Sequence, residues 1–268
     1  MSFSLSGKTA IVTGAANGIG LAIGRHFAES GANVIFADMD EANLQKELGE
    51  KLADEGPVRA FAGDLRQKLT IANLLSTTIA AFDRVDILVN ATRQITLSDP
   101  LDPDGDAVMP MIEQNLLTPL RVSQAVAKRM IRQVEDDEDA PAGTIINISS
   151  IAARRAHPDL LGFSVATAGL EQMTRSLAVA LAQHRVRVNA VAIGSVMSAS
   201  LKGMLRDNPD LRERVIDVTP LNRIAPASEL IGAVQYLASD ASAFVTGEVM
   251  TVDGGRSLID PVTMTAAH

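Results

Sequence analysis

The feature that most constrains the fold is a regular alternation between two kinds of segment. Short runs rich in β-branched and other apolar residues recur along the chain, namely TAIVT, NVIFA, DILVN, GTIINI, VRVNAVA and EVMTV. Several are apolar throughout, which is typical of strands that are covered on both faces. Segments of helical length with spaced apolar residues lie between them, at 18–30, 41–54, 67–82 and 164–184. This alternation predicts an α/β fold, a doubly wound parallel sheet of about seven strands with helices on both faces.

Length and composition fit one folded domain. The 268 residues exceed the usual single-domain size, but α/β sheets often reach this length as one unit. No stretch has the composition of a linker between domains. Two stretches that interrupt the alternation are expected to be loops, LSDPLDPDGD at 97–106 and the acidic run EDDED at 135–139.

Charge and cysteine content exclude several classes of function. A net charge of −8 offers no basic field to attract nucleic acid or anionic lipid. The chain has no cysteine, which rules out disulfides and thiolate nucleophiles, and its four scattered histidines argue against a metal site. The first residues, MSFSLSGKTA, lack the features of a signal peptide, and no apolar run approaches membrane-spanning length. We therefore expect a cytoplasmic protein with no metal, nucleic-acid or membrane partner.

A glycine-rich turn, TGAANGIG at 13–20, follows the first predicted strand and precedes the first predicted helix. Its glycines Gly14, Gly18 and Gly20 let the backbone turn tightly and approach a diphosphate, whose charge meets the free N–H groups of the helix. On its own such a turn fits nucleotide binding and a plain strand-to-helix connection about equally well.

An acidic residue at the end of the second predicted strand supports the nucleotide hypothesis. Asp38 lies close to the offset of roughly 20 residues at which an acid meets the adenosine ribose hydroxyls. A carboxylate there favours NAD over NADP because it would repel a 2′-phosphate, although Arg25 or Arg59 nearby would weaken this argument. The alternative is that Asp38 only begins the turn into the next helix.

With glycines spaced Gly-x-x-x-Gly-x-Gly, the chain resembles the short-chain dehydrogenase/reductase family along nearly its full length. The resemblance continues through AGDL with Asp64, DILVNA at 86–91, the segment EQNLLTPLRVSQAV, INISS at 146–150, VRVNAVAIGSVMS at 186–198 and YLASDASAFVTGEVMTVDGG, which ends at Gly255. It implies one Rossmann-like NAD(P)-binding domain over 1–268. The cofactor half would span roughly 1–145 and the catalytic half roughly 146–256, followed by a short C-terminal tail.

The resemblance also implies which residues would contact NAD(H). Asp64 and Leu65 would contact the adenine, Asn90 and Ala91 would line the cofactor, and 193–195 would lie near the nicotinamide. The full set of implied cofactor residues is Gly14, Asn17, Gly18, Ile19, Gly20, Asp38, Asp64, Leu65, Asn90, Ala91, Ile193, Gly194 and Ser195.

Two catalytic positions of the family are retained. Its serine maps to Ser150 and its asparagine to Asn115. Each has a structural alternative, since Ser150 would also suit a strand-end hydroxyl that satisfies a backbone group, and Asn115 an amide that bends a helix. We expect the inherited positions without inferring that they still act.

The departures from the family lie at its chemistry. The Tyr-x-x-x-Lys motif maps onto Phe163 and Thr167, Asn-Asn-Ala-Gly reads Asn-Ala-Thr-Arg with Arg93 last, and Pro-Gly reads Ile-Gly. The single tyrosine, Tyr236, lies in a later helix and is not placed to substitute. In the family the tyrosine exchanges a proton with the substrate oxygen and the lysine lowers its pKa. Phenylalanine has no proton to exchange, and general acid–base catalysis is worth roughly 10²–10⁴ in rate.

Other polar residues near these positions are candidates to replace the lost groups. They are Arg93, the pair Arg154 and Arg155, and His157. Arginine keeps its proton at neutral pH and would only stabilise an oxyanion. His157 titrates in a useful range but lies in a polar loop that suits a surface histidine.

Two hypotheses of function follow. The first is an NAD(H)-binding family member that has lost the usual chemistry and serves as a regulatory or partner subunit. The alternative is a working NAD-dependent oxidoreductase that acts on an alcohol or ketone with a rearranged proton donor. The loop expected at 197–219, which would cover the substrate, contains no decisive polar cluster.

The helix predicted at 164–184 suggests oligomerisation. Its stripe of Leu170, Met173, Leu177 and Leu181 is expected to face the sheet, and its other faces are rich in small and apolar residues. Cover would come from a neighbouring helix at 107–132 or from a second surface. In the family these helices pair across a two-fold axis, which implies a homodimer or homotetramer. Pairing with an active paralogue is the further extension.

Overall fold

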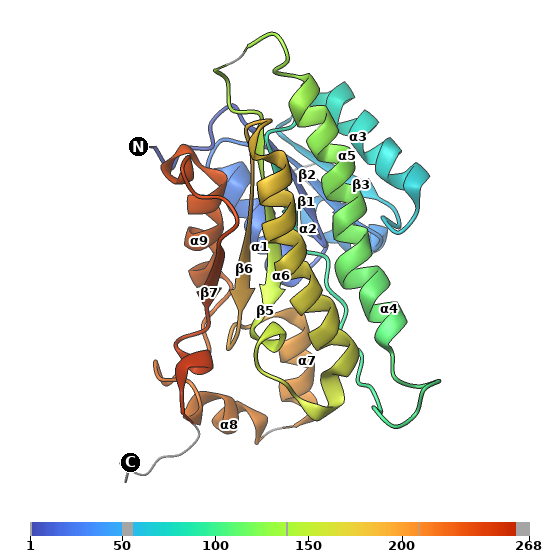
Figure 1. Ribbon diagram of the computed structural model, residues 1–268, viewed down its shortest axis with the longest axis vertical. Coiled ribbons are helices and arrows are strands. Elements are labelled where there is room, and N and C mark those ends of the chain that lie inside the picture. Colours follow the sequence, from blue (N-terminus) through green and yellow to red (C-terminus); the bar gives the residue numbers. More distant parts are fainter. Residues whose placement is uncertain (1, 50–55, 138, 209, 261–268) are drawn as a thin grey trace.

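Seven parallel strands form one sheet in the order β3-β2-β1-β4-β5-β6-β7 (Figure 1). The computed structural model describes residues 2–49, 56–137, 139–208 and 210–260. The strands are β1 Thr9–Thr13, β2 Asn33–Asp38, β3 Val58–Ala62, β4 Ile87–Asn90, β5 Gly143–Ser150, β6 Val186–Ile193 and β7 Val249–Val252.

Helices cover both faces of this sheet, and the predicted doubly wound parallel α/β fold is confirmed (Figure 1). Helices α1 and α9 pack on one face, whereas α3, α5 and α6 pack on the other. The helices are α1 Gly18–Glu29, α2 Glu41–Leu48, α3 Lys68–Phe82, α4 Val108–Ile112, α5 Thr118–Arg132, α6 Leu161–Ala182, α7 Ala199–Asp207, α8 Leu211–Asp217 and α9 Ser228–Ala238.

Alternate strand residues belong to two separate cores, which explains why several strands are apolar over most of their length. In β1, Val12 belongs to the core beneath α1 and α9, whereas Ile11 belongs to the core beneath α3 and α5. The parallel register places Ile11 beside Ile35 of β2 and Leu88 of β4, and all three are fully buried. Strands with two covered faces tolerate no polar alternation.

Several element boundaries differ from the sequence prediction. Strand β3 was not among the six apolar runs, because it is an edge strand whose residues after Val58 are only partly buried or exposed. The helix expected at 41–54 ends at Leu48 with Gly49 as its C-cap, and 50–54 lie outside the described residues. The loop expected at 197–219 holds helices α7 and α8, the first capped by Ser198, whose hydroxyl accepts the Leu201 N–H.

The two predicted loops are irregular, and 97–106 contains neither helix nor strand. The described part of the acidic run 135–139 is an exposed turn after α5. The C-terminal tail beyond 260 lies outside the described residues. Within the described ranges, no helix has the length and apolar content needed to cross a bilayer.

Helix α6 is rotated relative to the expected stripe. Leu170 is buried as predicted, but Met173, Leu177 and Leu181 are only partly buried. The face turned inward instead carries small and polar residues, including Thr174, whose hydroxyl accepts a hydrogen bond from the Asn147 amide of β5 at 2.9 Å. Because threonine and alanine are small, this face lies closer to the sheet than a leucine stripe would.

Candidate functional site

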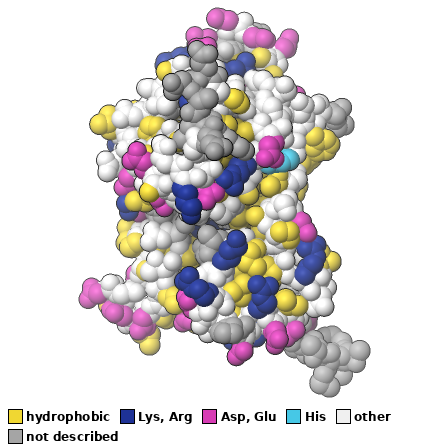
Figure 2. All heavy atoms as spheres, turned by 180° about the vertical axis from the view of Figure 1, so that it is seen from behind, with side chains coloured by type: hydrophobic (Ala, Val, Ile, Leu, Met, Phe, Trp, Pro, Cys, Tyr) yellow, Lys and Arg dark blue, Asp and Glu magenta, His cyan; other side chains and the backbone are white. Residues whose placement is uncertain are grey.

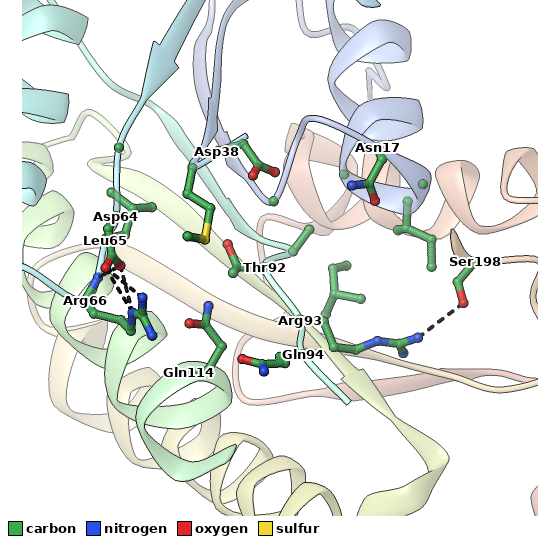
Figure 3. Close-up of a pocket in the computed structure, with 18 of the residues that line it drawn as sticks. Asn17, Asp38, Asp64, Leu65, Arg66, Thr92, Arg93, Gln94, Gln114 and Ser198 are labelled. Atoms are coloured by element: carbon green, nitrogen blue, oxygen red, sulfur yellow. Dashed lines mark hydrogen bonds and ion pairs between the residues drawn. The ribbon is translucent and has the colours of Figure 1, made fainter. Parts of the chain in front are cut away.

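A cavity of about 490 Å³ opens at the carboxyl ends of β1, β2 and β4 (Figure 3). Here the chain leaves β1 for β2 on one side and β4 lies on the other, which is the point where ligands bind in doubly wound sheets. Its lining residues are Gly14, Asn17, Gly18, Ile19, Gly20, Asp38, Met39, Gly63, Asp64, Leu65, Arg66, Ala91, Thr92, Arg93, Gln94, Gln114, Ile148, Ile193 and Ser198.

The turn between β1 and α1 has room only for glycine. Gly14 has φ +63°, and a Cβ on it would lie 2.6 Å from the Thr92 Cα. A Cβ on Gly20 would collide with the Gly14 carbonyl oxygen. Asn17, the N-cap of α1, makes no side-chain capping bond, so the first-turn N–H groups face the cavity. The turn therefore presents bare backbone donors to whatever occupies the cavity.

Asp38 joins the end of β2 to this turn. Its carboxylate accepts the Ala16 N–H at 3.0 Å and the Asp40 N–H at 3.1 Å, and it also lines the cavity. The two cations considered near it lie elsewhere: Arg25 pairs with Glu47 at 2.8 Å, and Arg59 lies 5.5 Å from the centre of the Phe82 ring. Neither arginine lines the cavity.

Beside Asp38 lies an ion pair between Asp64, which the sequence analysis includes, and Arg66, which it does not. Arg66 donates from Nε and Nη2 to the Asp64 carboxylate at 2.8 to 3.1 Å. The hydrogen bonds to Arg66 lower the pKa of Asp64, and the same pair raises the pKa of Arg66. The spacing of two residues after AGD was the available signal for Arg66. This end of the cavity is therefore close to neutral.

The opposite, inner end of the cavity carries an arginine that has no such partner. Arg93 donates from Nη2 to the Ser198 hydroxyl at 3.3 Å, and its Cζ lies 5.7 Å from the centre of the Phe163 ring (Figure 3). Among the described residues, none places a carboxylate in an ion pair with it. Burial lowers the pKa of the Arg93 guanidinium to about 10.

The residues at the expected tyrosine and lysine positions are both buried in α6. Phe163 is 2% exposed and packs with Met111 and Ala166. Thr167 is also 2% exposed, and its hydroxyl donates to the Phe163 carbonyl at 2.8 Å. One side chain is apolar and the other is satisfied within its own helix, so neither presents a proton or a charge to the cavity.

Ser150 and Asn115 make the structural bonds that were their alternative interpretations. The Ser150 hydroxyl accepts the Ala152 N–H at 3.2 Å. Asn115, in the π-helical turn Glu113–Leu117 between α4 and α5, donates to the Gln94 carbonyl at 3.0 Å and accepts the Gln94 N–H at 2.9 Å. Neither side chain lines the cavity.

Three of the predicted cofactor residues also lie away from the cavity. Asn90 donates to Ser123 at 3.0 Å and to Asn147 at 2.9 Å, within a buried polar network. Ser195 bonds to Thr219 at 2.8 Å and, with Gly194, lines a separate hollow of about 100 Å³. All the other predicted cofactor residues line the main cavity.

The remaining candidate proton donors are engaged outside the cavity. His157 is exposed and lies 3.8 Å from Asp159. Arg154 pairs with the buried Glu171 at 3.1 Å, and Arg155 donates to the Ser257 carbonyl. The described part of the chain contains no group of three or more histidine, cysteine or acidic residues arranged to hold a metal ion.

Charge is unevenly distributed over the surface. The chain as a whole carries −8, yet Lys and Arg side chains gather across the middle and lower part of one face, around exposed hydrophobic residues (Figure 2). Net charge is therefore a poor guide to the local field on this face.

Sequence and structure comparisons agree with this geometry. Residues 14–257 match the family described as enoyl-(acyl carrier protein) reductase. The 3-oxoacyl-(acyl-carrier-protein) reductase of Thermotoga maritima is 33% identical over 255 residues, which cover 94% of this chain and 98% of that protein. The chain belongs to the short-chain dehydrogenase/reductase family. It is thus a member of an oxidoreductase family, as the motifs implied.

Two solved short-chain dehydrogenases/reductases share the whole architecture. A 7α-hydroxysteroid dehydrogenase in complex with NADH and 7-oxo glycochenodeoxycholic acid superposes with a TM-score of 0.86 at 28% identity, covering 94% of this chain and 95% of that one. A gluconate 5-dehydrogenase from Burkholderia cenocepacia in complex with NADP and tartrate gives 0.85 at 27% identity, covering 96% and 98%. Relatives of this short-chain dehydrogenase/reductase therefore bind either nicotinamide dinucleotide.

Proposed function

We propose that this chain binds NAD(H) in the main cavity and lacks the proton-transfer groups of its family, so that it acts as a regulatory or partner subunit. The observation that carries the proposal is the burial of Phe163 and Thr167 in α6, where the family resemblance requires a tyrosine and a lysine. A subunit of this kind is inactive or weakly active in carbonyl reduction.

The residues of the cavity fit a dinucleotide. Gly14 and Gly20 allow the tight turn that leads into α1, because a Cβ on either would collide with neighbouring backbone. The helix N-terminus that follows suits a diphosphate. Asp38 suits the adenosine ribose hydroxyls, and the flat Arg66 guanidinium beside Leu65 suits an adenine ring, because guanidinium planes stack on aromatic faces. Bound NADH would supply a hydride.

The preference for NAD(H) over NADP(H) follows from the charges around Asp38. A 2′-phosphate would approach the Asp38 carboxylate, and like charges repel. Arg25 is held by Glu47 and Arg59 lies over Phe82, and neither lines the cavity. Arg66 does line this end of the cavity, but the Asp64 carboxylate offsets its charge. We expect NADH to bind at least about tenfold more tightly than NADPH.

Loss of proton transfer follows from what remains at the inner end. Arg93 stays protonated at neutral pH even with a pKa of about 10, so it does not act as a base. Ser150 and Asn115 form hydrogen bonds with backbone groups, and neither side chain lines the cavity. A bound hydride donor would therefore lack a partner that delivers the proton.

A second copy of the chain is the proposed cover for α6. Gly162 and Gly169 contact the segment around α4, so the chain covers that side of the helix itself. Val165 and Val179 remain 44% and 82% exposed on the outer side. We expect a homodimer or homotetramer, with an active paralogue as the alternative partner. Light scattering that gave a mass near 28.3 kDa in solution would contradict this assembly.

Two measurements on the purified chain test the proposed function. Calorimetry should show NADH binding and weaker NADPH binding. Asp38→Ala should reduce the difference between the two affinities. A panel of alcohols and ketones with NAD(H) should show no turnover above background. Tighter NADPH binding would overturn the Asp38 argument. Clear turnover would instead favour the working oxidoreductase with another proton donor.

A further inference from the structure

The inner end of the cavity has a fixed cation. The Arg93 side chain extends from the segment after β4 towards Ser198, as Figure 3 shows. It lies far from the acidic residues Asp38 and Asp64, which line the opposite end. The two ends therefore differ in charge, because Arg66 offsets the charge of Asp64 at one end, whereas among the described residues no carboxylate forms an ion pair with Arg93 at the other.

Hydrogen bonds hold the backbone on both sides of Arg93. The Thr13 hydroxyl accepts the Thr92 N–H at 3.3 Å, which ties the preceding residue to β1. Asn115 holds both backbone groups of Gln94, the following residue, at 2.9 and 3.0 Å. Because both neighbours are anchored, the arginine projects from a defined point into the cavity.

The charge of Arg93 is not offset by an ion pair, unlike that of several other arginines that the structure describes. Arg66, Arg84, Arg121, Arg154 and Arg223 each form an ion pair with a carboxylate. Arg93 instead donates to the Ser198 hydroxyl and lies over the face of Phe163. Its lowered pKa, caused by desolvation, reflects surroundings that already disfavour one positive charge.

A dinucleotide bound as proposed would direct its second half towards this cation. With the adenosine ribose at Asp38 and the diphosphate at the N-terminus of α1, the remaining lining includes Thr92, Arg93, Ile193 and Ser198. The oxidised nicotinamide ring carries a positive charge, whereas the reduced ring is neutral. The two redox forms of the cofactor therefore differ in charge at the end of the cavity where Arg93 lies.

We propose that Arg93 makes this cavity select NADH over NAD⁺, so that the chain reports the redox state of the nicotinamide cofactor without converting it. The inference rests on the proposed NAD(H) binding and adds the residue that distinguishes the two forms. Two like charges several ångströms apart, in an effective dielectric of about 20, correspond to roughly ten- to hundredfold in affinity. Solvent in the open cavity weakens the repulsion, so we expect about tenfold.

Calorimetry with NADH, NAD⁺ and ADP-ribose tests the inference on the parent chain and on two matched variants. ADP-ribose keeps the adenosine and the diphosphate but has no nicotinamide. The parent should bind NADH about tenfold more tightly than NAD⁺. Arg93→Lys, which keeps the charge, should retain the preference, whereas Arg93→Gln, which removes it, should bring the two affinities together.

Each other outcome separates this inference from the function on which it rests. Equal binding of NADH and NAD⁺ by the parent would overturn the inference and leave nucleotide binding intact. The inference would also be overturned if Arg93→Gln kept the preference for NADH. It would be overturned too if this variant bound NADH and NAD⁺ more tightly by the same factor, because the arginine would then only fill space. Failure of all three ligands to bind the folded parent would overturn the proposed function itself.

Discussion

The two ends of the cavity are built in different ways. At the outer end, where Asp38 and Asp64 lie, the groups suited to a diphosphate belong to the backbone: the turn at Gly14 and Gly20 and the uncapped N-terminus of α1. At the inner end everything depends on side chains, and there Phe163 and Thr167 are packed into α6 while Arg93 projects into the space. The proposed nucleotide binding and the proposed loss of proton transfer therefore concern different parts of the chain.

The largest expected effect comes from restoring the inner end. Phe163→Tyr with Thr167→Lys and Arg93→Gly should supply the proton donor, its neighbouring cation and an unobstructed cavity. We expect the rate of ketone reduction with NADH to rise by roughly 10²–10⁴ over the parent, the usual worth of general acid–base catalysis. A spectrophotometric assay of NADH oxidation over a ketone panel measures this rise.

The matched control keeps Phe163 and changes only the other two positions. Thr167→Lys with Arg93→Gly has the cation and the space but lacks the tyrosine hydroxyl that would donate the proton to the substrate oxygen, so it should remain at background. If the triple variant binds NADH and is still inert, the difference between the two ends extends beyond these three residues. The hydrogen bonds of Ser150 and Asn115 would then be the next contacts to examine.

A smaller effect is expected from damage to the outer end. Gly14→Ala places a methyl group against the backbone of Thr92, at a φ of +63° that alanine tolerates poorly. Left-handed strain and overpacking together should lower the free energy of unfolding by about 3 kcal/mol. NADH binding should be lost with it. Urea unfolding and calorimetry measure the two effects.

Gly7→Ala is the control that separates strain from collision. Gly7 has φ +75°, but a Cβ there would meet nothing within 4 Å. Only the conformational penalty of about 1 kcal/mol should remain, and NADH binding should be unchanged. Equal losses of stability in the two variants would show that the close approach of Gly14 to Thr92 is not what constrains the turn.

The fold was largely predictable from the sequence because its signals are local. Six of the seven strands can be recognised in the sequence as largely apolar runs, since both faces of the sheet are covered. Strand β3 was not predicted because an edge strand needs fewer apolar residues. The rotation of α6 was not predictable, because it depends on Thr174 meeting Asn147 of β5, a contact between residues distant in sequence.

The site was predictable where backbone geometry defines it and less so where side chains do. The glycine turn and Asp38 line the cavity as expected. Asn90, Gly194 and Ser195 are adjacent in sequence to residues that line the cavity, but they do not line it themselves. Asn90 is hydrogen-bonded to Ser123, and Gly194 and Ser195 line a separate hollow. The hydrogen-bond partners of a polar side chain depend on tertiary contacts, which the order of residues alone does not reveal.

The smallest expected effect concerns the stability that Arg93 removes from the fold. Burial lowers its pKa from the usual range of arginine to about 10, so above this pH the unfolded state binds more protons and stability rises with pH until the unfolded chain also loses the proton. At pH 7 both states are protonated, and the folded state bears the whole desolvation penalty. Arg93→Met removes the charge at similar length. We expect it to raise the free energy of unfolding by about 1 kcal/mol, less than the pKa shift alone would suggest because the side chain borders an open cavity.

Arg66→Met is the comparison at the other end of the same cavity. The Asp64 carboxylate raises the pKa of Arg66, so the sign is opposite and this variant should not be stabilised. Urea unfolding of both variants at pH 7 measures the contrast. A loss of stability in Arg93→Met would mean that the contacts with Ser198 and Phe163 outweigh the desolvation of the guanidinium. A gain would show that the chain carries an unpaired cation at the inner end at the expense of its own stability, as expected of a residue that acts on a ligand.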